Sequence, residues 1–199
     1  LTLGTTGYVG VPQYLNIPGK AVGFSGAPST ITLANGGALA TLGSVDFSLE
    51  AWIKPHSAAL TGETTILSKD NGGQNFRLIL DNGILSFKAT DDDGQVLWSS
   101  EPFTQTVSEQ LWSHVAVVRS GNVFSLYING QPAGATVTAP AGFDTMATAD
   151  DFIIGGGFTG MIADVRAWSH ARTQSDLQGY MNTRLSGDEY GLAGNWRLD

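Results

Sequence analysis

The sequence predicts an all-β protein in which two antiparallel sheets form a sandwich, with one short helix near the C-terminus. Residues 115–118 (VAVV) are a continuous apolar run, as expected of a strand that is covered on both faces. Residues 124–128 (FSLYI) alternate between apolar and more polar side chains, which gives a strand with one apolar face. Asn129-Gly130 follows, and this pair favours a type I′ hairpin turn because both central positions need positive φ.

The composition fits a single domain over residues 1–199. Apolar residues make up 42% of the chain, enough for a substantial core, and the 26 glycines suit many tight turns. The net charge is −8 and the ten Lys and Arg residues are scattered, so we expect no nucleic-acid partner. No apolar run reaches the roughly 18 residues of a membrane span, so no membrane insertion is expected. The chain begins at Leu1 rather than Met, so we expect a processed chain or an excised domain.

The first half of the chain divides into short strands separated by turns. Residues 1–20 predict an edge strand plus a loop, and residues 21–33 predict two short strands. Residues 47–53 alternate cleanly, and Pro55 ends that strand. A further strand is expected at residues 64–68.

The second half continues this pattern and adds the helix. The hairpin at residues 76–89 turns at Asp81-Asn82-Gly83, and residues 95–99 predict a strand after the acidic turn 91–94. Residues 131–149 read as a long connection. Strands are expected at 151–155, 160–169 and 191–198, and a helix at 174–182 in which Thr173 is the N-cap and Asp176 occupies position N3.

An ordered set of motifs resembles a known family. KAVGFSG, FSLEAWIKP, ILSK, LWSHVAVV, FSLYINGQPAG, FIIGG and GMIADVRAWSHARTQSDL follow one another between residues 20 and 199. The set is similar to bacterial laminin-G-like domains of the concanavalin A-like lectin/glucanase superfamily, which are related to pentraxins. The resemblance implies jelly-roll topology and no catalytic role. It also implies a cell-adhesion or recognition module of a secreted or surface protein that binds carbohydrate or protein, often with calcium. Residues 1–20 fall outside the pattern.

The carboxylates on strands do not predict a glycosidase. Laminarinase-like relatives carry three carboxylates spaced two apart, which points all of them into one cleft, where an acid and a nucleophile sit about 5 Å apart. Here Glu50 and Asp164 each stand alone within their strands. His114 lies within a strand motif, where we expect a packed structural residue.

Calcium is a possible ligand at the loop that follows residues 63–69. In the pentraxin pattern an Asp-Asn pair follows this strand, and here the pair is Asp70-Asn71. The pattern's second acidic loop is missing after FIIGG, so the pentraxin double site does not carry over. One Ca²⁺ ion held by Asp70, Asn71 and Asp92 is one interpretation, and a plain Asp-Asn-Gly-Gly turn is the other.

A ligand surface is predicted from polar loop residues and two aromatic residues. Gln74 and Asn75 can donate hydrogen bonds to sugar hydroxyls. Trp98 follows the acidic turn 91–94, and Phe158 lies in a glycine-rich loop with few local packing partners. The other strand-borne tryptophans are expected to pack in the interior.

Two functions therefore remain open. The first is a lectin-like module that binds a glycan or a cell-surface protein, with Ca²⁺ as its one candidate cofactor. The second is an assembly domain that docks onto neighbouring domains or subunits, with residues 1–14 as a candidate edge strand.

Overall fold

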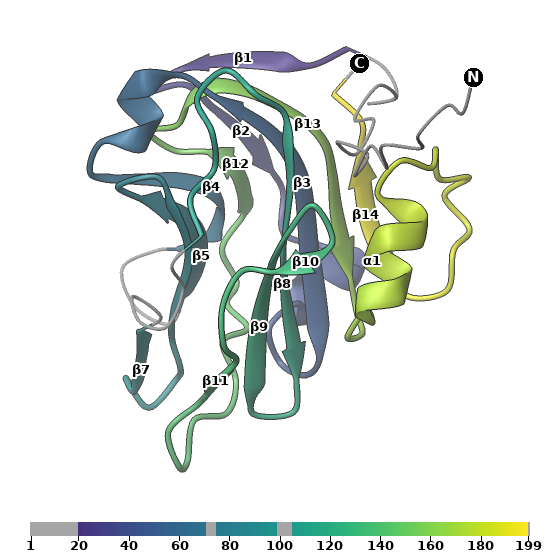
Figure 1. The fold of residues 1–199 in the computed structure, drawn as a ribbon. Coiled ribbons are helices and arrows are strands. Elements are labelled where there is room, and N and C mark those ends of the chain that lie inside the picture. Colours follow the sequence, from purple (N-terminus) through teal and green to yellow (C-terminus); the bar gives the residue numbers. More distant parts are fainter. Residues whose placement is uncertain (1–19, 71–74, 99–104, 199) are drawn as a thin grey trace, which may run out of the picture.

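The computed structural model describes residues 20–70, 75–98 and 105–198, which form a two-layer β-sandwich with one helix against the outer face of one sheet (Figure 1). Both layers are antiparallel, and the chain crosses between them several times, as in a jelly roll. The predicted fold class is confirmed. Residues 1–19, where an edge strand was predicted, lie outside the described part.

The first sheet has eight strands among the described residues, and β13 pairs with three of them. Its order is β1-β13-β3-β8-β9-β10, while β11 pairs with β9 and β14 pairs with β13. The strands of this sheet are β1 (Val22–Ser25), β3 (Phe47–Pro55), β8 (Ser113–Ser120), β9 (Val123–Ile128), β10 (Gln131–Pro132), β11 (Val137–Thr138), β13 (Thr159–Trp168) and β14 (Leu192–Trp196). The strands β1 and β14 pair with opposite ends of β13 along the same edge.

The second sheet has six strands among the described residues, in the order β2-β12-β4-β5-β6-β7. They are β2 (Thr30–Leu33), β4 (Glu63–Lys69), β5 (Asn75–Asp81), β6 (Ile84–Thr90), β7 (Val96–Trp98) and β12 (Phe152–Gly155). The 3-10 helices η1 (Gly37–Thr41) and η2 (Ser57–Leu60) flank β3 in sequence. The long connection predicted at residues 131–149 contains β10 and β11, and its Phe143 and Met146 side chains enter the core.

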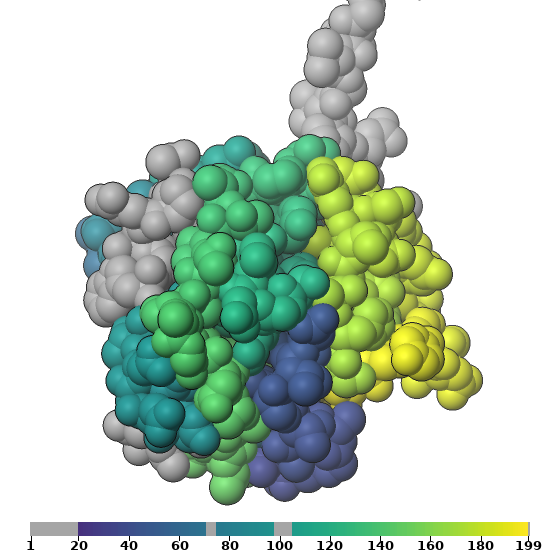
Figure 2. Space-filling view, turned by 90° about the horizontal axis from the view of Figure 1, so that it is seen from below, coloured from purple at the N-terminus to yellow at the C-terminus, as the bar shows by residue number. Residues whose placement is uncertain are grey.

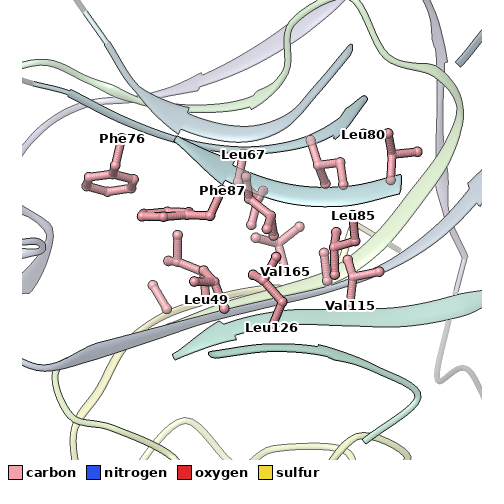
Figure 3. Packing of buried hydrophobic residues seen from close by; sticks show 14 of the residues in the cluster. Leu49, Leu67, Phe76, Leu80, Leu85, Phe87, Val115, Leu126 and Val165 are labelled. Atoms are coloured by element: carbon pink, nitrogen blue, oxygen red, sulfur yellow. The ribbon is translucent and has the colours of Figure 1, made fainter. Parts of the chain in front are cut away.

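The core lies between the two sheets and is built from the side chains that alternate inward along each strand (Figure 3). A row of phenylalanines forms its centre: the ring centroids of Phe47 and Phe76 are 5.6 Å apart, and those of Phe87 and Phe124 are 5.5 Å apart. All four side chains are at most 1% exposed. Offset aromatic packing of this kind adds to the stabilisation from apolar burial.

The helix α1 (Gln174–Tyr180) covers part of the outer face of the eight-stranded sheet. Thr173 and Asp176 form the predicted cap as a reciprocal capping box. Leu177 packs onto Ala116 and Val118, which are the outward residues of β8. Trp52 Nε1 donates to the carbonyl of Met181 at 2.9 Å, which ties the end of the helix to β3. No helix in the described residues has the length and apolarity needed to cross a membrane.

Candidate functional site: the acidic rim

The lone carboxylate Glu50 lies in a sealed polar cluster beneath α1. Outward positions of β3 alternate with the core positions, so Glu50 faces the layer formed by α1 and residues 169–172. It is fully buried, and His114 Nε2 lies 3.1 Å from its Oε2 atom. Burial alone would raise the pKa of Glu50, but His114, Arg166 and Arg172 together hold that pKa below its ordinary value. The expectation that His114 is a packed structural residue agrees with its 1% exposure.

The second lone carboxylate, Asp164, is also buried and paired with a basic side chain. It sits at a bulge of β13 with φ of 47°, where the register to β3 shifts. Arg166 donates to it from Nε at 3.1 Å and from Nη2 at 2.5 Å, and both side chains are buried. The carboxylates of Glu50 and Asp164 are therefore inaccessible to a substrate.

Exposed acidic groups gather instead at one end of the sandwich. Antiparallel pairing places the last residue of one strand beside the first residue of the next: Lys69 pairs with Phe76, Asn75 with Thr90, and Thr90 with Val96. Asp70, Asn75 and the connection 91–95 therefore lie at one end of the sandwich, which we call the acidic rim. Arg119 holds the connection 139–151 at the same end through the carbonyl of Asp144. Its aspartates are Asp46, Asp70, Asp91, Asp92, Asp93, Asp144, Asp150 and Asp151.

Two basic side chains anchor the acidic rim to the sandwich. Arg119, at the end of β8, donates to the carbonyls of Gly43 at 3.0 Å and Asp144 at 2.6 Å. Lys69, at the end of β4, donates to Asn35 Oδ1 at 2.9 Å and to the Leu39 carbonyl at 2.8 Å. Burial lowers the pKa of both groups. Figure 2 views the molecule from this end, where the teal segment of β6 and β7 and the green segment before β12 lie side by side.

The predicted calcium residues are only partly placed. Asp70 is exposed at the acidic rim, and its Oδ2 atom lies 3.4 Å from Arg77 Nε. Asp92 lies at the same end, and among the described residues its carboxylate groups with those of Asp91 and Asp144, without Asp70. Asn71 lies outside the described residues, so the set of Asp70, Asn71 and Asp92 stays a prediction.

Of the predicted ligand-binding residues, some lie in the described strands and one lies outside the described residues. Asn75 begins β5 at the acidic rim and is half-buried. Trp98 ends the edge strand β7, where its backbone pairs with Lys88. Gln74 lies outside the described residues.

The prediction for Phe158 is wrong as a surface residue. Phe158 is fully buried within the core cluster, so its ring cannot face a ligand. Gly155, Gly156 and Gly157 all adopt φ between 90° and 100°, and this backbone turns the following residue inward. Its carbonyl also accepts from Gly26 N at 2.9 Å, which fixes the connection to β1.

Three carboxylates converge at the acidic rim in a way that the sequence did not reveal. Asp91, Asp92 and Asp144 each offer an oxygen within 4.8 Å of the others. The sequence predicts a role for Asp92 and its turn, whereas Asp144 lies more than fifty residues further along the chain and is not marked by any motif. No local pattern marks such a pair, because only the packing of two loops brings these residues together.

The comparisons with known proteins agree with this fold. The family model Laminin_G_3, described as concanavalin A-like lectin/glucanases superfamily, matches residues 25–178. The chain belongs to this superfamily. No curated protein sequence matches it significantly.

Solved structures of related folds include several binding modules. A candidate carbohydrate-binding protein from Bacteroides ovatus is 24% identical with a TM-score of 0.67, over 90% of this chain and 51% of that chain. The CBM40 module of Ruminococcus gnavus IT-sialidase, bound to α2,3-sialyllactose, is 16% identical with a TM-score of 0.64 over 82% of this chain and 98% of the module. Domain 4 of AbnA, an extracellular GH43 arabinanase of Geobacillus stearothermophilus, was solved with arabinotriose. It is 19% identical with a TM-score of 0.61, over 82% of this chain and 84% of that chain. This concanavalin A-like chain spans about half of the Bacteroides structure, and these likenesses show the shared fold.

Proposed function

We propose that this concanavalin A-like domain is a non-catalytic, lectin-like module that binds glycans as part of an extracellular protein. The superfamily match supports a recognition role, and two of the similar modules hold an oligosaccharide, namely sialyllactose and arabinotriose. One of these modules belongs to an extracellular enzyme, which supports the extracellular placement.

The observation that carries the proposal is the contrast between the two kinds of acidic group. Glu50 and Asp164, which lie within strands, are at most 3% exposed and engaged by basic side chains, so they cannot act on a glycosidic bond. Exposed carboxylates such as those of Asp70, Asp92 and Asp144 lie instead on loops at the acidic rim. Such groups suit hydrogen bonds to sugar hydroxyls, and function on a shared fold resides in such local sites.

The proposed ligand surface is the part of the acidic rim around β5 and β7. Asn75 supplies an amide there, Asp70 supplies a carboxylate beside Arg77, and Trp98 is the proposed stacking platform at the sheet edge. A sugar held between amide, carboxylate and indole groups would combine directional hydrogen bonds with apolar contact, as small-ligand sites generally do.

A glycan array tests the proposal, with the purified chain probed in parallel in Ca²⁺ and in EDTA. We expect binding to at least one class of glycan, and a loss of 10-fold or more in affinity for Trp98→Ala. Asp188→Ala, an exposed acid remote from these strands, serves as the matched control and should bind as the wild type does. No binding to any glycan in either condition would refute the lectin and favour a domain that docks onto its neighbours. Release of a shortened glycan would refute the non-catalytic assignment.

A further inference from the structure

We propose that Asp91, Asp92 and Asp144 form a binding site for a hard divalent cation of the calcium type, which joins the β6–β7 turn to the connection before β12. The proposal stands apart from glycan binding, because its test measures the cation directly. It also differs from the Asp70-Asn71 site that the family resemblance implies.

The first argument is the convergence of three oxygens. Each of the three carboxylates offers one oxygen, and these atoms all lie within 4.8 Å of one another. Calcium binds oxygen ligands at about 2.3–2.6 Å, so two ligands on opposite sides of one ion are roughly 5 Å apart. The observed spacing therefore leaves room for one ion in contact with all three groups.

The second argument is a buried carboxylate oxygen that has no partner. Asp91 is only 1% exposed. Its Oδ1 atom accepts from Gln95 N at 2.6 Å, but its Oδ2 atom is enclosed and accepts no hydrogen bond from the described residues. A buried oxygen of an acidic group is costly to leave unsatisfied, and a bound cation would satisfy it.

The third argument is the crowding of like charges. Asp91, Asp92 and Asp144 bring three acidic groups within 4.8 Å of one another, where like charges repel. A divalent ion between the three carboxylates would relieve that repulsion.

The basic side chain near these carboxylates, Arg119, binds backbone carbonyls. The guanidinium of Arg119 donates to the carbonyls of Gly121 at 3.0 Å, Gly43 at 3.0 Å and Asp144 at 2.6 Å. These bonds fix the backbone at Asp144. Three acidic groups therefore face one another with their backbones held in place and no cation between their side chains among the described residues.

The donor set selects the class of metal. All three ligands are carboxylate oxygens, with no thiolate or imidazole, which suits calcium and magnesium rather than zinc or copper. Magnesium demands a near-ideal octahedron, whereas calcium accepts irregular loop geometry and six to eight oxygens. Two exposed aspartates also leave room for water to complete the shell, so calcium is the favoured ion.

Calorimetry and thermal unfolding with CaCl2 test the site, on chain first stripped with EDTA and then dialysed. We expect one bound Ca²⁺ per chain and a Tm rise of about 5–10 °C when calcium exceeds its Kd 100-fold. Magnesium should give a smaller rise. Binding should weaken at acidic pH, because carboxylate ligands must be deprotonated to hold a metal ion.

Four variants locate the ion. Asp144→Asn, at an exposed position, should weaken calcium binding at least 10-fold, and Asp91→Asn should do the same if it folds. Asp93→Asn removes an equal charge from the same turn without removing a ligand, and should change the Kd less than 3-fold. Asp70→Asn should leave binding unchanged. Absence of a Tm rise at 10 mM CaCl2 would overturn the proposal, and so would a loss of binding in Asp70→Asn but not in Asp144→Asn.

Discussion

Replacing Glu50 by alanine should destabilise the protein severely without touching a ligand surface. Glu50 is fully buried, His114 Nε2 lies 3.1 Å from its Oε2 atom, and Arg172 Nε lies 4.0 Å from its Oε1 atom. Glu50→Ala would leave these basic groups buried against an apolar methyl group. Removal of one partner from a buried ion pair costs about 3–5 kcal/mol, because the other charge is left without compensation.

The size of the expected effect follows from the size of the chain. A loss of about 3–5 kcal/mol shifts Tm by roughly 6–20 °C at 2–4 °C per kcal/mol, which is typical of a domain of this length. Differential scanning calorimetry at pH 7 measures the shift. Glu109→Ala is the matched control, since Glu109 is exposed and its loss should move Tm by no more than about 2 °C.

The pH dependence provides an independent check. The folded-state pKa of Glu50 lies below its ordinary value of 4.5. Its ionised form therefore stabilises the fold above about pH 4.5, and this contribution is lost as the pH falls through the folded-state pKa. The Tm difference between the wild type and Glu50→Gln should narrow from pH 7 to pH 3. A Glu50→Ala protein that melts within 2 °C of the wild type at pH 7 would refute the reasoning.

Three further predictions concern the core, the helix and an acidic turn. Phe87→Ala should lower the free energy of unfolding by about 3–5 kcal/mol in urea titrations, because a ring that is 1% exposed leaves a cavity. Thr173→Ala removes the capping box with Asp176 and should cost about 1 kcal/mol in the same assay, with Thr173→Ser restoring most of it. The backbone N–H of Ser186 lowers the pKa of Glu189 to about 2, which an NMR titration of the carboxyl should show. The matching contribution to stability is present above about pH 4.5 and disappears towards pH 2, and Glu189→Gln should abolish that dependence.

Most strands could be predicted because their patterns are local. The alternation of residues 47–53 agrees with β3, and the turn at Asn129-Gly130 has φ values of 54° and 71°, as its sequence predicts. The capping box at Thr173 also depends on residues three apart. In each case the physical cause lies within one turn or one strand, so the element can be predicted from the sequence alone.

The candidate site could be predicted only in part, because it depends on contacts between distant segments. Phe158 lies in a glycine-rich stretch that suggests an exposed loop, yet three successive glycines with positive φ direct it into the core. Asp144 follows a Pro-Ala-Gly turn with no distinctive spacing, and it reaches Asp92 only because Arg119 holds its backbone against the end of the sheet. The placement of both residues follows from tertiary packing rather than from any local pattern.

Glu50 and Asp91 are both buried, but their surroundings have opposite charge. This difference indicates a structural role for Glu50 and a binding role for Asp91. Glu50 is surrounded by His114, Arg166 and Arg172, and these basic side chains of the protein hold its pKa below the ordinary value. Asp91 is buried to the same degree, but its neighbours are further carboxylates and one of its oxygens has no described partner. A buried, ionised acidic group is costly unless a positive group or hydrogen-bond donors meet its oxygens. At Glu50 the chain supplies that charge itself, and at Asp91 a cation from solution is the component that would complete the arrangement.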